Sequence, residues 1–125
     1  MGRWFITAAA VSGFLAVAIG AFGAHGLKQR LSPDLMAVYQ TGVQYHFWHT
    51  LALLAVGIML SVGLQNRWLV ASGGLFAGGI VLFSGSLYLL ALTGIRGLGA
   101  ITPLGGLLWL VAWACLAYGS WRITW

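Results

Sequence analysis

The sequence contains almost no acidic side chains and little charge of either sign. Asp34 is the only carboxylate side chain among 125 residues, and charged residues of all kinds make up 6% of the chain. Apolar residues make up 61%. A water-facing surface cannot be built from so few polar side chains, so this composition excludes a soluble globular domain. The chain is predicted to be a small membrane protein.

The positive charge is not gathered into a basic run. Six Lys and Arg residues against one Asp give a formal net charge of +5, an excess that in a soluble protein would suggest nucleic-acid binding. Here the cations stand at the ends of apolar stretches, where helix flanks meet lipid headgroups. They are Arg3, Lys28, Arg30, Arg67, Arg96 and Arg122. We therefore expect a lipid bilayer around the chain, no nucleic-acid partner and no polybasic lipid switch.

Cysteine and catalytic motifs are equally scarce. Cys115 is the only cysteine, so no disulfide can form within the chain. Nucleophilic catalysis needs a Ser or Cys activated by an oriented base. Ser84 and Ser86 lack the G-x-S-x-G setting of a serine nucleophile, and Cys115 is far from every histidine in the sequence. The chain is not expected to be an enzyme or to carry a cofactor.

What the sequence does contain is four apolar stretches, each long enough to cross a bilayer. They cover approximately residues 4–24, 45–64, 68–92 and 102–118 of a single integral membrane domain, 1–125. Ser32 followed by Pro33 is a helix start, with a capping hydroxyl and a proline in the first turn. We interpret the helix that begins there as a short interfacial helix between spans one and two. The predicted fold is an all-α, four-helix transmembrane bundle.

Small residues supply the expected helix contacts, because the hydrophobic effect cannot drive one helix against another in lipid. On span one, small residues recur every four positions. They are Ala8, Ser12, Ala16, Gly20 and Ala24. On span three, Gly74 and Gly78 form a GxxxG pair. Both patterns predict close helix packing and no chemistry.

The three histidines are the candidate site residues. With four spans, His25 at the end of span one and His46 and His49 at the start of span two fall at the same membrane face. Four further polar candidates belong to this side, and Tyr45 accompanies the histidines at the start of span two. The four are Ser84, Ser86, Tyr88 and Arg96. Any site is therefore expected on the histidine-bearing side.

The histidines have more than one interpretation. Imidazole near a helix end can sit at headgroup level or form an interhelical hydrogen bond. An ionisable residue within a span also suggests function, and His25, His46 and His49 could hold a transition metal or haem. A proton or small-molecule relay is a further alternative. Such a relay would need a chain of polar groups across the bilayer, and the middle of all four spans lacks charge.

Five segments carry a resemblance to a known family. They are residues 20–28 (GAFGAHGLK), 39–42 (YQTG), 45–51 (YHFWHTL), 82–88 (LFSGSLY) and 102–106 (TPLGG). The first is similar to the G-A-F-G-A-H-x-L signature of the YgdD-like family of small bacterial inner-membrane proteins. The resemblance covers almost the entire chain and implies a four-helix, multi-pass protein of the bacterial inner membrane. It implies no activity, because the family is of unknown function.

Our preferred hypothesis is therefore a non-enzymatic membrane protein that acts through helix packing. Such a protein would be an accessory or interaction subunit of a membrane assembly, with a membrane-protein partner or as a homo-oligomer. One alternative is binding of a small ligand, metal or haem by the histidine cluster. The other is an oligomeric transporter or channel, because four spans are too few to enclose a pore alone.

Overall fold

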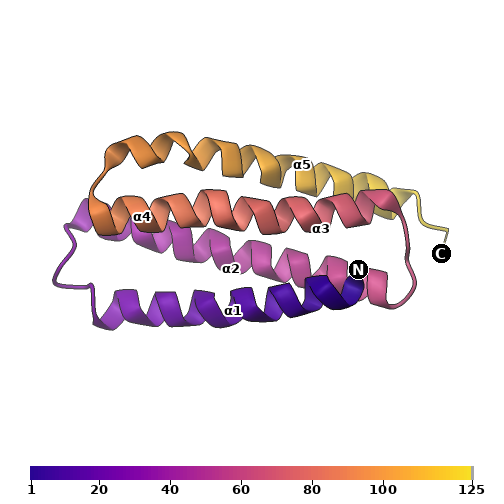
Figure 1. The fold of residues 1–125 in the computed structure, drawn as a ribbon, viewed down its shortest axis with the longest axis horizontal. Coiled ribbons are helices and arrows are strands. Elements are labelled where there is room, and N and C mark those ends of the chain that lie inside the picture. Colours follow the sequence, from indigo (N-terminus) through magenta and orange to yellow (C-terminus); the bar gives the residue numbers. More distant parts are fainter. Residues whose placement is uncertain (125) are drawn as a thin grey trace.

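The computed structural model describes residues 1–124, and over that range its regular elements are all helical. They are α1 (Gly2–His25), α2 (Pro33–Ser61), α3 (Arg67–Gly79), the π-helical turn η1 (Ile80–Ser84), α4 (Gly85–Thr93), the 3₁₀ turn η2 (Arg96–Ala100) and α5 (Thr102–Trp121). Because α3, η1 and α4 follow one another without a break, they form one long rod (Figure 1). Four helical segments within the described residues are long and apolar enough to cross a membrane. This confirms the predicted all-α, four-helix membrane bundle.

Side-chain caps begin two of the helices. Ser32 Oγ accepts a hydrogen bond from the amide of Leu35 at 3.2 Å, and Pro33 occupies the first turn of α2. Asn66 Oδ1 accepts from the amides of Trp68 and Leu69, both at 3.0 Å. These caps satisfy amide groups that have no partner inside the helix. The start of α2 is therefore where the sequence predicts it.

The separate interfacial helix predicted between spans one and two is wrong. Residues 33–44 are the first turns of α2, which continues without interruption to Ser61. The physical reason is that this segment packs inside the bundle. Tyr39 is buried, and a Cβ at Gly42 would lie 2.8 Å from the ring of Tyr88 on α4. An apolar face that meets α4 has no reason to lie flat on the membrane surface.

The link between α4 and α5 is regular, although residues 93–99 contain three glycines. Gly94 ends α4 in the left-handed region, with φ of 72°, a conformation that glycine adopts without steric cost. The chain then forms the 3₁₀ turn η2 before Thr102 begins α5. This link is therefore short and regular.

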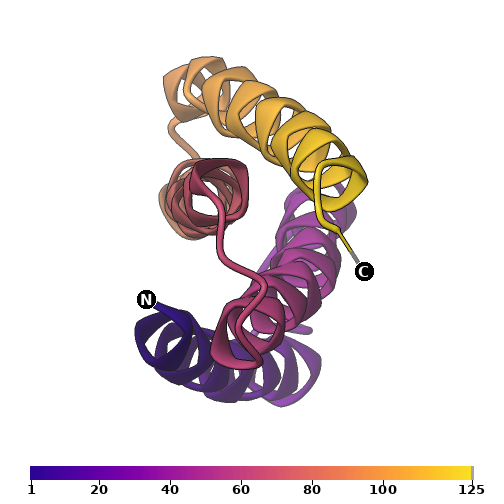
Figure 2. The ribbon, with the colours of Figure 1, turned by 90° about the vertical axis from the view of Figure 1, so that its right-hand side faces the viewer.

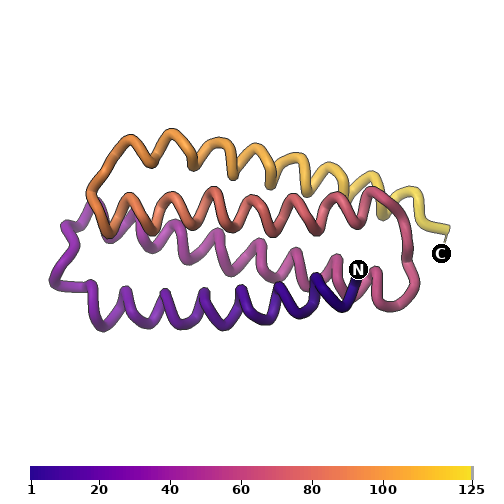
Figure 3. Tube along the Cα trace, viewed as in Figure 1, coloured from indigo at the N-terminus to yellow at the C-terminus, as the bar shows by residue number. Residues whose placement is uncertain are grey.

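The four rods form an open arrangement rather than a closed square. Helix α1 packs along α2, α5 packs along α3 and η1, and α2 contacts the α3–η1–α4 rod. Figure 2 shows α1 and α5 at the two outer positions, with α2 and the α3–η1–α4 rod between them. Both termini and the α2–α3 link lie at one end of the bundle, and the other two links lie at the opposite end (Figure 3). Large parts of α1 and α5 therefore face lipid.

Small residues bring α1 close to α2, and the predicted stripe lies only partly in the contact. The buried small residues of α1 are Gly2, Ala9, Ala16 and Gly23, which recur every seven positions. Seven residues are nearly two helical turns, so this spacing keeps one face on the neighbouring helix. Ala8 and Ala24 are exposed instead. A stripe spaced by four drifts around the helix, so only its middle members Ser12, Ala16 and Gly20 face α2.

The GxxxG pair on α3 is also not the packing site. A Cβ at Gly74 would meet nothing within 4 Å, and one at Gly78 would make only an ordinary contact at 3.5 Å. The glycines next to them carry the contacts. A Cβ at Gly73 would overlap the ring of Phe5 on α1, and one at Gly79 would overlap Trp109 on α5. These two glycines make room for aromatic rings rather than for another backbone.

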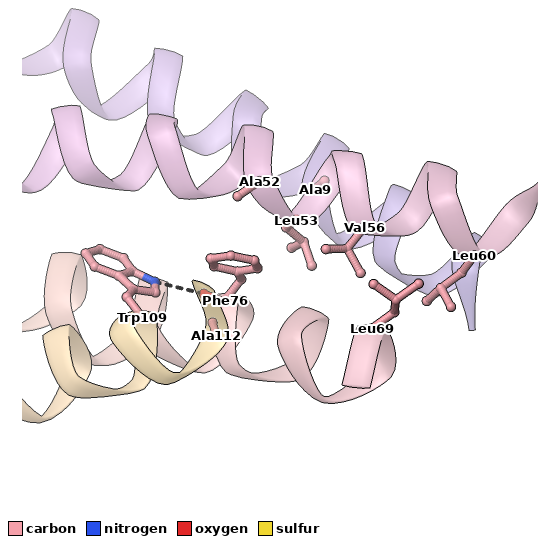
Figure 4. Packing of buried hydrophobic residues seen from close by; sticks show 9 residues of the cluster. All are labelled: Ala9, Ala52, Leu53, Val56, Leu60, Leu69, Phe76, Trp109 and Ala112. Atoms are coloured by element: carbon pink, nitrogen blue, oxygen red, sulfur yellow. Dashed lines mark hydrogen bonds between the residues drawn. The ribbon is translucent and has the colours of Figure 1, made fainter. Parts of the chain in front are cut away.

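The buried core joins all four rods at mid-depth. Leu53 and Val56 of α2 face Phe76 of the α3–η1–α4 rod, and Trp109 of α5 lies beside Phe76 (Figure 4). The Trp109 indole Nε1–H donates to the Phe76 carbonyl at 3.1 Å, so its polar atom is satisfied in the core. Nearby, a Cβ at Gly105 would lie 2.8 Å from Phe83 Cα, which brings the α5 and η1 backbones together. Aromatic packing and one close backbone contact therefore hold α5.

We predict that Gly105→Ala destabilises the bundle and Gly74→Ala does not. Both glycines are helical, and the alanine gains about 1 kcal/mol of helix propensity at either site. At Gly105 the new methyl group meets the η1 backbone, and such overpacking costs about 1–3 kcal/mol. Unfolding in mixed micelles with increasing SDS measures the difference. Equal stability of the two variants would contradict the close α5–η1 contact.

Candidate functional site

Two of the three histidines lie deep in the bundle. His46 and His49 are near the midpoint of α2 and are 4% and 7% exposed. His25 is the last residue of α1 and is exposed. The prediction that the three gather at one membrane face is therefore wrong, because α2 begins at Pro33 and reaches mid-depth by His46. The candidate site is the pair of buried histidines and their partners.

His46 joins three helices through a chain of hydrogen bonds. Its Nε2 lies 2.9 Å from Ser12 Oγ on α1, and its Nδ1 lies 2.8 Å from the Tyr88 hydroxyl on α4. Ser12 Oγ is also 2.6 Å from Thr50 Oγ1, one turn further along α2. The Thr50 hydroxyl donates to the His46 carbonyl at 2.8 Å. We call these four residues the His46 chain.

The last bond determines the direction of all the others. A hydroxyl has one proton, and that of Thr50 goes to the His46 carbonyl, so Ser12 must donate to Thr50. Ser12 Oγ then accepts from the Nε2–H of His46, and Nδ1 accepts from the Tyr88 hydroxyl. His46 is thereby a neutral imidazole protonated at Nε2. The chain ends on a backbone carbonyl, which cannot pass a proton onward.

His49 has the opposite tautomer and a different set of partners. The indole Nε1–H of Trp113 is a donor only, and it lies 3.2 Å from His49 Nε2, which must therefore accept. Nδ1–H then donates to the Tyr45 carbonyl at 2.8 Å. The ring also stacks on Trp109, with centroids 3.7 Å apart and planes 4° apart. Both nitrogens of this neutral imidazole are satisfied, and α2 is joined to α5.

The two histidines line two different grooves. The α1–α4 groove has a volume of about 480 Å³ and is lined by Ala8, Val11, Ser12, Leu15, Ile19, His46, Leu53, Ala77, Ile80, Val81, Gly85 and Tyr88. The α2–α5 groove has a volume of about 550 Å³ and is lined by Tyr45, His49, Phe83, Pro103, Gly106, Leu107, Trp109, Leu110 and Trp113. The imidazoles are thus one turn apart in α2 but do not form one cluster.

The serines predicted as polar candidates also join helices. Ser84, in the π-helical turn, donates to the Gly42 carbonyl of α2 at 2.7 Å. Ser86 donates to the Phe83 carbonyl at 2.8 Å and lies 2.6 Å from Thr102 Oγ1 at the start of α5. Neither serine is beside a histidine that could act as its base. Their hydroxyls fasten the α3–η1–α4 rod to α2 and α5.

Of the remaining candidates, Tyr88 and Tyr45 are partners of the buried histidines and Arg96 is not. Tyr88 belongs to the His46 chain, and Tyr45 lends its carbonyl to His49 while its ring lies 36% exposed in the α2–α5 groove. Arg96 is exposed in η2 at the end of the bundle and takes part in neither group. Sequence analysis missed Ser12, Thr50 and Trp113 as members of the site. The hydroxyl of Thr50 one turn after His46 was the available signal.

The geometry does not form a metal centre. Within residues 1–124, no group of three His, Cys, Asp or Glu side chains is close enough to share an ion. Each buried histidine has both ring nitrogens occupied by hydrogen-bond partners, so neither presents a lone pair to a ligand. The proposed cluster of His25, His46 and His49 is therefore wrong as a geometric unit. The polar groups serve to join helices.

We predict that His46→Leu destabilises the bundle and His25→Leu does not. Leucine at position 46 removes one of the two partners of Ser12 and the acceptor of the Tyr88 hydroxyl, and a buried polar group left unsatisfied costs about 1–3 kcal/mol. His25 is exposed and makes no such bond among the described residues. Unfolding in mixed SDS micelles compares the two variants with the wild type. Unchanged stability of His46→Leu would contradict the role of the His46 chain.

Comparison with known sequences gives a consistent result. The family described as "Protein of unknown function (DUF423)" matches residues 19–106. The chain is 46% identical to the UPF0382 membrane protein SSP2132 of Staphylococcus saprophyticus over 120 residues, which are 95% of this chain and 98% of that protein. It is 46% identical to the UPF0382 membrane protein YwdK of Bacillus subtilis over 116 residues, 93% of this chain and 94% of that one.

A third relative agrees with the resemblance found in the motifs. The UPF0382 inner membrane protein YgdD of Escherichia coli is 44% identical over 124 residues, which are 97% of this chain and 92% of that protein. No solved structure matches the chain. The resemblance to the YgdD-like family is therefore confirmed. The chain belongs to the DUF423 family and is a multi-pass protein of the bacterial inner membrane.

Proposed function

We propose that this protein is a non-enzymatic interaction subunit of a membrane assembly, and that the α1–α4 groove receives a transmembrane helix of its partner. The observation that carries the proposal is the groove itself, which is apolar along its length and open on the lipid side. Val11 and Val81 on its two walls are 56% and 70% exposed. An apolar groove of about 480 Å³ between two transmembrane rods is a place for hydrocarbon or for another helix.

The residues on the walls favour a helix over lipid tails. Ala8, Ala77 and Gly85 line the groove, and a Cβ at Gly85 would meet nothing within 4 Å. Small residues allow a second backbone to approach closely, which is the main source of contact energy between helices in lipid. Flexible lipid acyl chains gain less from such a surface because they have no rigid backbone to lay along it.

The polar residues support the same proposal because their hydrogen-bonding groups are already used within the protein. The hydrogen bonds of His46, Ser12 and Thr50 are used within the protein. Within the described part of the chain, no buried side-chain nitrogen or oxygen lacks a partner. A catalytic base or a relay across the bilayer would need an available lone pair or proton. Helix association needs neither.

We predict that a photo-crosslinking amino acid at Val81 captures protein in native membranes and that one at Val17 captures lipid. Val17 is a matched control because it is 65% exposed on α1, against 70% for Val81, and does not line the groove. Mass spectrometry of the adducts distinguishes a different subunit from a second copy of this chain. Adducts with lipid alone at both positions would contradict an interaction subunit.

Filling the groove is a second test. We predict that Gly85→Leu removes the protein adduct at position 81, whereas Gly74→Leu leaves it unchanged. Both glycines are helical and have open space where the side chain would go, so both variants are expected to fold. Only the leucine at position 85 projects into the groove, where it takes the place of the partner helix. Retention of the adduct in Gly85→Leu would place the partner elsewhere.

A further inference from the structure

A cavity of about 540 Å³ lies beside the α2–α3 link. This link is at the end of the bundle that carries both termini (Figure 1). The cavity is formed by the α2–α3 link, the start of α3 and the end of α5. Its polar walls include Gln65, Asn66, Arg67, Arg122 and Thr124. It shares no residue with the α1–α4 groove, so it requires an explanation of its own.

Two guanidinium groups line this cavity and rest on neighbouring aromatic rings. Arg67 Cζ lies 5.3 Å from the centroid of Trp68, and Arg122 Cζ lies 5.9 Å from that of Tyr118. The two rings pack edge to face, with centroids 4.9 Å apart and planes at 86°. Cation–π contacts of this kind restrain the arginine side chains. The ring pair thereby holds two positive charges beside the same space.

The local charge is not balanced by an acidic side chain. Asp34 is the only one in the sequence, and it lies in the first turn of α2, at the opposite end of the bundle. Arg67 is also the first residue of α3, where the helix dipole adds partial positive charge, whereas α5 ends at Trp121 beside the same cavity and adds partial negative charge. The full charges of the exposed Arg67 and Arg122 outweigh these partial charges, and an anion between the two would lower their mutual repulsion. The site therefore has the electrostatics of an anion site.

The depth of the cavity identifies the class of anion. Helix α3 begins at Arg67 and α5 ends at Trp121, so the cavity lies where the spanning segments meet the headgroup region. Trp68 and Tyr118 are the aromatic residues expected at that level. The anions concentrated there are the phosphates of phospholipids. Arginine binds phosphate through paired N–H donors.

We propose that this cavity binds the headgroup phosphate of a net anionic phospholipid, such as phosphatidylglycerol or cardiolipin. Arg67 binds the phosphate at the start of α3, and Arg122 adds a second positive charge from α5. That second cation disfavours zwitterionic phosphatidylcholine, because its ammonium group would come close to a guanidinium. The bound lipid thereby joins the α2–α3 link to the end of α5.

The test is lipid binding to the purified, delipidated protein, followed by native mass spectrometry. Cardiolipin, phosphatidylglycerol and phosphatidylcholine are added separately to the wild type, Arg67→Gln, Arg122→Gln and Arg3→Gln. Arg3 is the matched control because it lies at the same end with its Cζ 5.3 Å from the Trp4 ring, yet is not part of the cavity. A parallel series adds an excess of inorganic phosphate to compete with bound lipid.

We expect the wild type to bind the anionic lipids about tenfold more tightly than phosphatidylcholine, as one charge-assisted hydrogen bond allows. Arg67→Gln and Arg122→Gln should each lose most of that preference, and Arg3→Gln should keep it. No preference in the wild type, or an equal loss in Arg3→Gln, would overturn the proposal. Displacement of lipid by inorganic phosphate would overturn the lipid assignment in favour of a soluble phosphate compound.

Arg67→Lys keeps the proposal testable if the glutamine variants prove unstable. Lysine keeps the charge but loses the planar fork of donors. It should fold like the wild type, keep part of the preference for anionic lipid and bind it less tightly than arginine does. Wild-type affinity in Arg67→Lys would contradict paired hydrogen bonding at this position.

Discussion

Hydrocarbon offers no hydrogen-bond partner, so every polar group within a spanning helix must find one inside the protein. This bundle meets that constraint at mid-depth, where His46 and His49 sit in α2, the helix that contacts α1 and all three parts of the α3–η1–α4 rod. His46 is satisfied by α1 and α4, and His49 by α5. One helix therefore fixes the positions of the other three through two neutral imidazoles, each with a single tautomer.

Contacts at glycines and between aromatic rings add to these hydrogen bonds in holding the four rods together. Small residues let α1 lie close to α2, and Gly79 makes room for Trp109, the ring that stacks on His49. Each outer helix is held mainly by one neighbour, which leaves a groove on either side of the central pair. Large apolar parts of α1 and α5 are therefore not covered by the rest of the bundle.

Much of this fold follows from the sequence, and the site follows less well. Apolar length predicts the four rods, and Ser32 with Pro33 predicts where α2 begins. The depth of His46 follows from that start once α2 is taken as continuous. The partners of His46 depend on the register of α1 against α2. With 19 glycines in the chain, several small-residue stripes were equally plausible, and only packing selects Gly2, Ala9, Ala16 and Gly23.

No sequence pattern predicts the π-helical turn at Ile80–Ser84, yet this turn contacts both α2 and α5. It brings Ser84 to the Gly42 carbonyl of α2 and the Phe83 backbone to Gly105 of α5. A π-helical turn contains one residue more than an α-helical turn. In a regular α-helix, the side chains after residue 84 would therefore point in other directions around the helix axis. Tyr88 follows the turn, and its hydroxyl reaches His46 because the turn rotates α4 into that position. The register of the His46 chain therefore depends on one irregular turn, whose residues Ile80 and Val81 also line the α1–α4 groove.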